Sequence, residues 1–274
     1  MTKSVSPPRI AFIGAGNMAS ALVRGLLNQG TAPYNITVAS PRINRQHPFC
    51  QQCDVQITRD NARAAAQADI VILAVKPQVL QTIAGDLRAI VLQRQPLVIS
   101  LAAGVRVKTL AGWLGNHIPI VRCMPNLPVT LQAGMTGLYA DSAVTAALRA
   151  QAESLLSSVG VILWVEREQM LDAITAVSGS GPGYVFLMQE AMEEAAQHLG
   201  LDAVSARLLT TQTFLGAAQM VASGTVSPAD LRARVCSPGG TTEAGIRTFE
   251  QRQIKAIFRE ALNSACQRSF ALAQ

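Results

Sequence analysis

A turn of small residues near the start of the chain has the pattern of a phosphate-binding site. Gly14, Gly16 and Ala19 follow the apolar run Ile10–Ile13 with the spacing G-x-G-x-x-A. Gly14 permits a tight turn, Gly16 lets the backbone approach a pyrophosphate, and Ala19 lets a helix pack close to the strand. The N-terminus of that helix offers unpaired N–H groups and the positive end of its dipole. Because the expected strand and helix flank the turn, the pattern favours dinucleotide binding over a purely structural turn.

The end of the second predicted strand indicates which dinucleotide is bound. An Asp or Glu there would hold the ribose 2′-OH of NAD, but no carboxylate follows this strand before Asp54. Ser40 could instead hydrogen-bond a 2′-phosphate, and Arg42 could pair with it as a planar fork. Taken in isolation, Arg42 is explained equally well as a solvated arginine in an ordinary loop. Together with the glycine turn, the pattern favours NADP.

The histidines and cysteines add little further chemistry. His47, His117 and His198 have no plausible catalytic partner beside them and are interpreted as structural or exposed. Cys50 and Cys53, with His47 three residues upstream, look like part of a metal site, but no second cluster supplies a fourth ligand. We therefore expect no metal, and the role of the two cysteines stays open.

Two runs of Gly, Pro, Ser and Thr in the second half of the chain have the composition of anion pockets. Ser178–Gly183 precedes a long predicted helix, with Thr175 just upstream, and Ser237–Thr242 precedes another. Backbone N–H groups and hydroxyls gathered in this way bind a carboxylate without a basic side chain. Ordinary helix caps are the alternative, but a cap needs only one Ser or Thr. Runs of this length favour the anion pocket.

Short apolar runs separated by helical patterns fill the first half of the chain and indicate the sheet that positions these groups. Continuous Val, Ile and Leu runs are typical of strands buried on both faces. Strands that alternate with helices imply right-handed crossovers in a doubly wound, mostly parallel sheet. Lys76 follows one of these strands at its carboxyl end, as either a ligand contact or a solvated loop lysine. The predicted strands are Ile10–Ile13, Ile36–Ala39, Ile70–Val75, Leu97–Leu101, Ile118–Arg122, Met135–Tyr139 and Val161–Val165.

The strands stop near residue 165, and the rest of the chain is predicted to be helical. The segment Ser205–Ser223 has apolar or small residues on most sides, as in a helix that is buried all round. Roughly 110 residues can hardly bury several such helices alone, so we expect helix exchange or tight packing between two subunits. The sequence thus predicts an α/β fold with a Rossmann-type NADP-binding domain (1–165) and an all-α dimerisation and substrate-binding domain (166–274). The expected helices are Pro182–Leu199, Ser205–Ser223, Pro228–Val235 and Arg252–Ala273.

The composition excludes several classes of protein. Of the 274 residues, 49% are apolar and 15% are charged, which excludes a disordered chain. The cations behind the formal charge of +6 are scattered singly, so we expect no nucleic-acid partner. Mean hydropathy is +0.26, yet no apolar run approaches the 18 or so residues needed to cross a bilayer, so we expect no membrane partner and a large subunit interface instead. Five cysteines and no recognisable signal peptide favour the cytoplasm.

Six ordered segments make the chain resemble the pyrroline-5-carboxylate reductase family nearly from end to end. Their order and spacing look like those of that family, and six segments are far more specific than one glycine turn. Two departures, Gly183 in place of the usual alanine and Cys123 inside the Arg-x-Met-Pro-Asn segment, remove no proposed functional group. The segments are Ile13–Met18, Ala74–Pro77, Ser100–Val105, Arg122–Asn126, Thr175–Pro182 and Ser237–Thr242.

The resemblance implies the last step of proline biosynthesis, in which a hydride passes from NADPH to C5 of the cyclic imine 1-pyrroline-5-carboxylate and gives L-proline. NADH is expected to be accepted as well. The family also implies a homodimer with intertwined helical domains, often assembled into a ring of dimers (a decamer), and a pocket completed by the partner chain. A cyclic imine can enter already protonated, so no positioned acid of the kind that a ketone reductase uses is needed. The protein must mainly orient the reactants.

The resemblance also implies the roles of particular residues. Thr175 is the catalytic candidate and is expected to hydrogen-bond the ring nitrogen, as a positioning group more than a proton donor. The residues expected to bind the substrate carboxylate are Ser237, Gly239, Gly240, Thr241 and Thr242. Those expected to bind the cofactor are Gly14, Gly16, Asn17, Met18, Ser40, Arg42, Ala74, Val75, Lys76, Pro77, Ala102, Ala103, Gly104, Met124, Pro125 and Asn126.

Two other functions compete with this interpretation. A β-hydroxyacid dehydrogenase would share the N-terminal fold, but that family needs a catalytic lysine in its helical domain, and no lysine occurs between Lys108 and Lys255. A non-catalytic NADP sensor or scaffold would keep the glycine turn and Arg42 but would not need the carboxylate pocket. Oxidation of NADPH in the presence of the imine separates the enzyme from the sensor.

Overall fold

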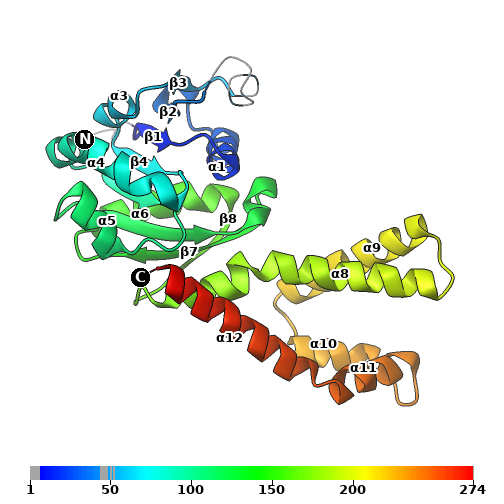
Figure 1. Cartoon of the computed structure of the whole chain (residues 1–274). Coiled ribbons are helices and arrows are strands. Elements are labelled where there is room, and N and C mark those ends of the chain that lie inside the picture. Colours follow the sequence, from blue (N-terminus) through cyan, green and yellow to red (C-terminus); the bar gives the residue numbers. More distant parts are fainter. Residues whose placement is uncertain (1–6, 44–48, 50, 52, 274) are drawn as a thin grey trace. The chain divides into compact units, whose positions relative to one another are not determined.

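The computed structural model of the protein describes residues 7–43, 49, 51 and 53–273. An eight-stranded sheet with the strand order β3-β2-β1-β4-β5-β6-β7-β8 dominates the first part of the chain, and helices follow it (Figure 1). The strands are β1 (Ile10–Ile13), β2 (Ile36–Ala39), β3 (Gln56–Thr58), β4 (Ile70–Leu73), β5 (Leu97–Ser100), β6 (Ile120–Pro125), β7 (Gly134–Ala140) and β8 (Gly160–Trp164).

The strand order reverses beside β1. This strand pairs in parallel with β2 on one side and with β4 on the other, so that Ile13 lies level with both Ala39 and Leu73. The carboxyl ends of three strands therefore meet at one edge of the sheet. Ligands of open α/β sheets bind in the crevice at such a reversal point, which makes this edge the first place to look for a site.

The sheet is mostly parallel, as predicted. The neighbours from β3 across to β6 all pair in parallel, whereas β7 pairs antiparallel with β6 and parallel with β8. The sequence did not predict β3, because this strand has only three residues and its side chains are exposed or partly exposed. A strand this short and polar leaves no apolar run to detect.

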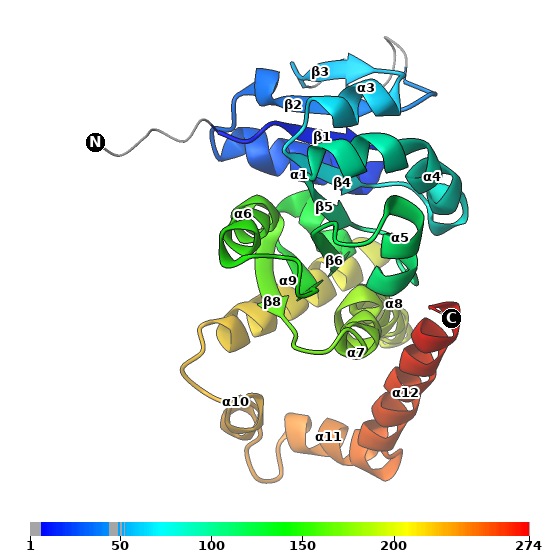
Figure 2. The ribbon, with the colours of Figure 1, turned by 90° about the vertical axis from the view of Figure 1, so that its left-hand side faces the viewer.

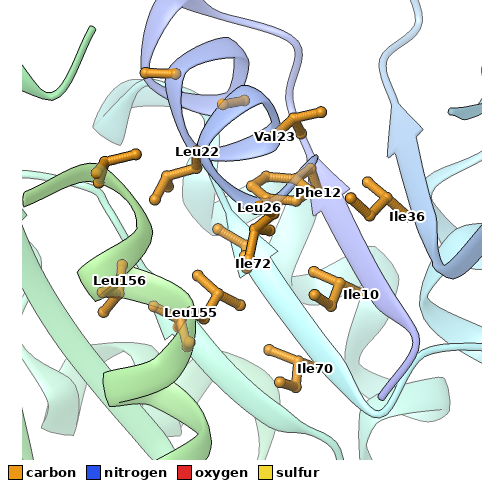
Figure 3. Packing of buried hydrophobic residues seen from close by; sticks show 14 of the residues in the cluster. Ile10, Phe12, Leu22, Val23, Leu26, Ile36, Ile70, Ile72, Leu155 and Leu156 are labelled. Carbon is orange, nitrogen blue, oxygen red and sulfur yellow. The ribbon is translucent and has the colours of Figure 1, made fainter. Parts of the chain in front are cut away.

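Alternate residues of the strands divide the core between the two faces of the sheet. Ile10 and Phe12 of β1 pack in one cluster with residues of α1 and α6 (Figure 3). Ala11 and Ile13 belong to a second cluster with residues of α3, α4 and α5. Both faces are therefore covered by helices, which is the reason that continuous apolar strands predict this fold. The helices are α1 (Asn17–Asn28), α3 (Asn61–Ala66), α4 (Pro77–Arg94), α5 (Val107–Leu114) and α6 (Ala146–Leu156).

Contacts divide the chain into two compact units. The sheet unit runs to Ser180 and also contains Ala265–Gln274, and the helical unit is Gly181–Ser264. The predicted boundary between 165 and 166 lies where the strands end, but a helix that follows the last strand can still pack on the sheet. The segments grouped with the sheet in this way are α7 (Met170–Ile174), the π-helical segment η4 (Thr175–Gly179) and the end of α12 (Ile254–Leu272). The division into 1–165 and 166–274 stays a prediction.

The helical unit leaves most of its apolar side chains exposed. Within the described chain, α8, α10 and α11 contain no buried residue, and α9 buries only Ala206 and Thr210. Helices α8 and α9 lie side by side (Figure 2), where Gln189 Nε2 donates to Thr211 Oγ1 at 2.8 Å. The helices of this unit are α8 (Gly181–His198), α9 (Ala203–Ala222), α10 (Pro228–Val235), α11 (Thr241–Gln251) and the start of α12. In the described part of the chain, no helix has the length and apolar character needed to cross a membrane.

Candidate active site

A cavity of about 510 Å³ lies at the carboxyl ends of β1, β2 and β4. Three segments that are far apart in the sequence meet there: the glycine turn, the loop after β2 and the loop after β4. All three segments were predicted to bind the same dinucleotide. The lining residues are Gly14, Ala15, Gly16, Ala39, Ser40, Pro41, Arg42, Asn61, Ala74, Val75, Lys76, Val79 and Ile83.

Gly14 is fixed where no other residue fits. Its N–H donates to the carbonyl of Ala39 at 2.8 Å, and its φ is +112°, a region that side chains rarely adopt. A Cβ at this position would lie 2.5 Å from the carbonyl oxygen of Ala74. The backbone of β1 must therefore pass directly between the ends of β2 and β4, which forms the floor of the cavity.

Gly16 has the opposite surroundings. A Cβ there would have nothing within 4 Å, and its φ of −80° is open to any residue. Gly16 caps α1 without a side-chain hydrogen bond, so the first N–H groups of the helix have no side-chain acceptor among the residues that the structure describes. The open space in front of them suits a bound phosphate. Asn17 and Met18 form the first turn of α1 and do not line the cavity themselves.

The polar groups of the cavity favour an anionic ligand. Arg42 and Lys76 are exposed cations in its lining, and among the residues described there none is a carboxylate. The backbone N–H of Arg42 lies 3.4 Å from Ser40 Oγ, which folds the loop so that both side chains belong to the same lining. Two cations with no neighbouring carboxylate attract phosphate groups.

Asn61 is a lining residue that the sequence did not single out. It is the first residue of α3, after Asp60, whose side chain caps the helix by accepting from the N–H of Arg63 at 3.0 Å. Asn61 Oδ1 is buried and has no hydrogen-bond partner among the described residues. A buried acceptor without a donor is costly, and a ligand donor in the cavity would satisfy it. Asn61 lies just after a strand at the carboxyl edge of the sheet, and this position could have identified it as a site residue. Because the sequence did not predict β3, the position was not recognised.

The remaining predicted cofactor residues lie at the ends of β4, β5 and β6. Pro77 begins α4. Ala102, Ala103 and Gly104 form the loop after β5, in which Gly104 has φ +75° and a Cβ would lie 2.8 Å from the carbonyl oxygen of Leu272. These residues do not line the cavity beside the glycine turn. Their assignment to the cofactor therefore stays a prediction.

Asn126 uses its side chain within the protein. Its Nδ2 donates to Ser178 Oγ at 3.2 Å, and its Oδ1 accepts from the N–H of Met135 at 2.9 Å. Met124 lies in the same region, since a Cβ on Gly179 would be 2.8 Å from its Cε. The end of β6, including Pro125, is thus held against the π-helical segment η4. Asn126 acts here as a brace between the two.

Thr175 opens this π-helical segment. The N–H of Ser180 donates to the Thr175 carbonyl at 2.8 Å, which closes a wide turn of a kind that is frequent at functional sites. The Thr175 hydroxyl donates to the carbonyl of Leu171 at 2.7 Å. Because a carbonyl can only accept, the hydroxyl proton is used in this hydrogen bond. The lone pairs of Thr175 Oγ1 remain free to accept a hydrogen bond from a ligand.

The turn 237–242 belongs to the helical unit and is described here by itself. The N–H of Gly239 donates to Glu243 Oε2 at 2.8 Å, and the N–H of Gly240 donates to the carbonyl of Ser237 at 3.0 Å. Helix α11 begins at Thr241 without a side-chain cap. Among the described residues, the N–H groups of Ser237, Thr241 and Thr242 are left without an acceptor, and the last two lie in the first turn of α11, where an anion is favoured.

The cysteines described by the structure are free. Burial raises the pKa of the Cys123 thiol far above its usual range, and its Sγ donates to the carbonyl of Ser100 at 3.3 Å. Burial also raises the pKa of Cys53, against the opposing effect of Arg24. Neither thiol is activated as a nucleophile. His47 and Cys50 lie outside the described residues, and no group of metal-binding side chains occurs among those described.

Comparison with known families finds two matches that together span most of the chain. Residues 9–104 match the family model described as "NADP oxidoreductase coenzyme F420-dependent". Residues 168–272 match the model described as "Pyrroline-5-carboxylate reductase dimerisation". The first match contains the glycine turn and the second contains Thr175 and the turn 237–242.

Whole-chain comparisons agree with these matches. A pyrroline-5-carboxylate reductase from Pseudomonas aeruginosa is 47% identical over 270 residues, which cover 98% of each chain. The solved pyrroline-5-carboxylate reductase of Coxiella burnetii is 42% identical, covers 97% of this chain and 99% of its own, and has a TM-score of 0.93. The pyrroline carboxylate reductase of Plasmodium falciparum, solved with NADP bound, is 26% identical, covers 99% and 100%, and has a TM-score of 0.87.

Proposed function

This chain belongs to the pyrroline-5-carboxylate reductase family, and we propose that it transfers a hydride from NADPH to C5 of 1-pyrroline-5-carboxylate and so forms L-proline. The resemblance carried by the six sequence segments is thereby confirmed. The chain is an oxidoreductase with an N-terminal nicotinamide-binding fold. Its substrate, its cofactor preference and the roles of its residues are proposals.

The cavity beside the glycine turn is the observation that carries the proposal. Its residues fit a dinucleotide: open space in front of Gly16, uncapped N–H groups at α1, two cations and the unpartnered oxygen of Asn61. NADPH, when bound there, supplies the hydride. The chain's part is to hold the pyrophosphate at the start of α1 and a 2′-phosphate between Ser40 and Arg42. Asn61 Oδ1 accepts from a hydroxyl or amino group of the cofactor.

Thr175 holds the imine rather than protonating it. Its hydroxyl proton already points at the carbonyl of Leu171, so its oxygen can only accept from a ring N–H. A protonated cyclic imine has such an N–H, and the positive ring is also the better hydride acceptor. The imine thus arrives with its proton, C5 takes the hydride, and the product nitrogen keeps its N–H on Thr175 Oγ1. No general acid is needed in this step.

The substrate carboxylate is bound by the free amides of Thr241 and Thr242 together with their hydroxyls. Gly239 and Gly240 serve by shaping the turn, since their own N–H groups are already bonded to Glu243 and Ser237. Uncapped amides at a helix start favour an anion without a basic side chain. This division of roles supports recognition of a ring that carries one carboxylate.

A homodimer is the proposed working unit, with a ring of dimers (a decamer) as the larger assembly. The match to a dimerisation model and the exposed apolar helices support the dimer. Light scattering in solution measures both states. Free thiols throughout the described cysteines suit a reducing compartment, and we propose that the enzyme works in the cytoplasm.

Turnover tests the function directly. The purified chain, NADPH and 1-pyrroline-5-carboxylate are mixed, and loss of absorbance of the reduced nicotinamide is followed with proline as the measured product. Oxidation coupled one to one with proline supports the reductase. Absence of oxidation at every imine concentration, with NADPH binding intact, would instead support a sensor.

The cofactor assignment is tested by Arg42→Ala, with Arg94→Ala on the exposed end of α4 as a matched loss of charge. Loss of a charge-assisted fork to the 2′-phosphate should weaken NADPH by about 10- to 100-fold and leave NADH within about threefold. Binding of both nucleotides is measured by fluorescence titration. An equal loss for NADPH and NADH would reject the assignment, and Arg94→Ala should change neither. The same titration of the unaltered chain shows whether NADH is accepted.

A shared active site is tested by mixing two variants of strongly reduced activity, Thr175→Val and Thr241→Gly/Thr242→Gly. If the carboxylate turn and Thr175 of one site come from different subunits, a hybrid dimer regains one intact site, and equal mixing restores about a quarter of full activity. If both come from one subunit, mixing restores nothing. Exchange of subunits is verified with a tagged chain.

A further inference from the structure

A buried charged network lies in the sheet unit and has no part in the chemistry described above. Arg106 Nη2 lies 2.6 Å from Asp172 Oδ2, and Ser269 Oγ donates to Asp172 Oδ1 at 2.8 Å. The side chains of Arg106 and Asp172 are only 16% and 4% exposed. The three residues come from the loop before α5, from α7 and from the last part of α12. One carboxylate therefore joins three segments that are distant in the sequence.

Each of these segments is adjacent to a residue of the proposed site. Arg106 follows two residues after Gly104, in the loop expected to bind the cofactor, and Asp172 precedes Thr175 by three residues. The end of α12 reaches the same loop, because a Cβ on Gly104 would lie 2.8 Å from the carbonyl oxygen of Leu272. The network thus links the 102–104 loop with the segment that carries Thr175.

Further contacts strengthen the same link. The Arg106 guanidinium lies 5.9 Å from the centre of the Phe270 ring, within the range of a cation–π interaction. Glu168, four residues before Asp172, accepts from the N–H of Val107 and from Arg122 Nη1, each at 2.9 Å. Two carboxylates of one short segment therefore hold the start of α5 against the strand β6 and the end of α12.

The network contributes little to stability, which suggests that its role is to fix the position of the loop. A buried ion pair is a poor source of stability, since desolvation of both charges offsets their attraction, and apolar replacements of similar volume are often no less stable. Arg106 Nη1 is also buried without a partner among the described residues, which adds an uncompensated donor. Apolar side chains would fill this space at lower cost, but they would not fix the direction of the loop.

We propose that Arg106, Asp172 and Ser269 are positioning residues for hydride transfer: they hold the 102–104 loop at a fixed distance from Thr175, so that the nicotinamide and the imine ring meet in a reactive geometry. The inference rests on the proposed function. It concerns the same imine substrate and the same cofactor as that function. The last turn of α12 thereby becomes part of the catalytic framework, although it contributes no group to the reacting atoms.

The decisive variant is the charge-free pair Arg106→Met/Asp172→Leu. It keeps the space filled, so thermal unfolding should stay close to that of the unaltered enzyme. Enzyme preloaded with NADPH is mixed with the imine in a stopped-flow experiment. The rate of hydride transfer should fall by about 30-fold or more, while NADPH affinity changes by less than about threefold. The deuterium isotope effect on kcat with NADPH deuterated at C4 should rise, because the chemical step becomes limiting.

Arg88→Met is the matched control. Arg88 anchors the other end of α5, where its Nη1 donates to the carbonyls of Gly112 and Trp113 at 3.2 and 3.3 Å. This variant loses an arginine of α4 that bonds to the far end of α5 but leaves the 102–104 loop alone, so its hydride-transfer rate should stay within about twofold. A charge-free pair that transfers hydride as fast as Arg88→Met would overturn the proposal.

Ser269 gives a test that does not depend on the stability of the buried pair. Ser269→Ala removes one hydrogen bond to Asp172 and should slow hydride transfer by about three- to tenfold at unchanged NADPH affinity. Ser269→Thr keeps the hydroxyl and should restore the rate. Unchanged hydride transfer in Ser269→Ala would contradict the network's role, as would an increase in KM alone. Failure of the unaltered enzyme to turn over would instead defeat the proposed function, so the two failures are distinguishable.

Discussion

The sheet unit and the helical unit bury their apolar residues to very different extents. In the sheet unit, strands such as β1, β4 and β5 are buried along their whole length, between two clusters of side chains. In the helical unit, long apolar residues of α8 and α9 remain on the surface, among them Phe186, which is 56% exposed, and Leu208, which is 68% exposed. One unit encloses its own core, and the other does not.

The difference shows which part of the function one chain can perform. The cofactor cavity is lined by a single sheet unit, whose backbone is fixed by its own hydrogen bonds. The apolar surface of the helical unit is too large to be left in water, and a second copy of the same helices is the proposed cover. Cofactor binding should therefore depend on the fold of one chain, and catalysis on the assembly of two.

Charges placed on the exposed helix face should have the largest effect. Leu208→Asp/Leu215→Asp puts two carboxylates where we expect apolar contact between subunits, and desolvating them should reduce both dimer formation and turnover by about 100-fold or more. Sedimentation measures the dimer. NADPH binding by the separated chain should persist. Tyr34→Asp, at a residue of the sheet unit that is 71% exposed, is the control and should leave assembly unchanged. If NADPH binding were lost together with the dimer, cofactor binding would not depend on the fold of one chain alone, and the comparison between the two units would fail.

Substitution of the two glycines of the turn should have the next largest effect. Gly14→Ala meets the Ala74 carbonyl at 2.5 Å and a positive φ, and should lower the free energy of unfolding by about 3 kcal/mol or more. Gly16→Ala meets nothing within 4 Å and should leave thermal unfolding unchanged. Its methyl group would occupy the space proposed for the pyrophosphate, so NADPH affinity should still fall by about 10-fold or more. If Gly16→Ala binds NADPH normally, the pyrophosphate lies elsewhere.

Thr175 gives an intermediate effect on turnover alone. Thr175→Val keeps the shape and removes the acceptor for the ring N–H, so kcat should fall by about 10- to 100-fold with little change in NADPH affinity. Thr175→Ser keeps the hydroxyl and should retain most of the activity. Steady-state kinetics with both variants measure the change in kcat separately from the change in the KM for NADPH. A normal kcat in Thr175→Val would remove this residue from the site.

Thiol reactivity gives the smallest effect and sharpens the comparison between the units. Because burial holds the Cys123 pKa far above its usual range, a thiol reagent at about pH 8 should leave Cys123 unlabelled in the folded enzyme. Cys236, partly exposed in the helical unit, should be labelled, and faster in Leu208→Asp/Leu215→Asp than in the unaltered dimer. Mass spectrometry locates the label. Rapid labelling of Cys123 would mean that the sheet unit opens.

The strongly periodic parts of the fold were predictable from the sequence, whereas features that depend on packing were not. The runs Ile10–Ile13 and Ile36–Ala39 predicted β1 and β2 with the observed limits, because short, mainly apolar runs suit a buried strand. The short strand Gln56–Thr58 carried no such signal, so Asn61 after it was missed. The composition drew attention to the segment around Thr175, but the catalytic role of Thr175 was predicted only through the resemblance, since its π-helical turn has no distinctive local pattern.

By itself, the sequence determined the mostly parallel sheet, the glycine turn, the group of candidate residues and the family, because these depend on residue types at short, fixed spacings. Only the tertiary structure decided which N–H groups of the 237–242 turn are still free, that the Thr175 hydroxyl is committed to Leu171, and that Ser269 shares a carboxylate with Arg106. Such pairings join atoms that lie far apart along the chain or compete for one partner, and they become definite only when the backbone has closed around them.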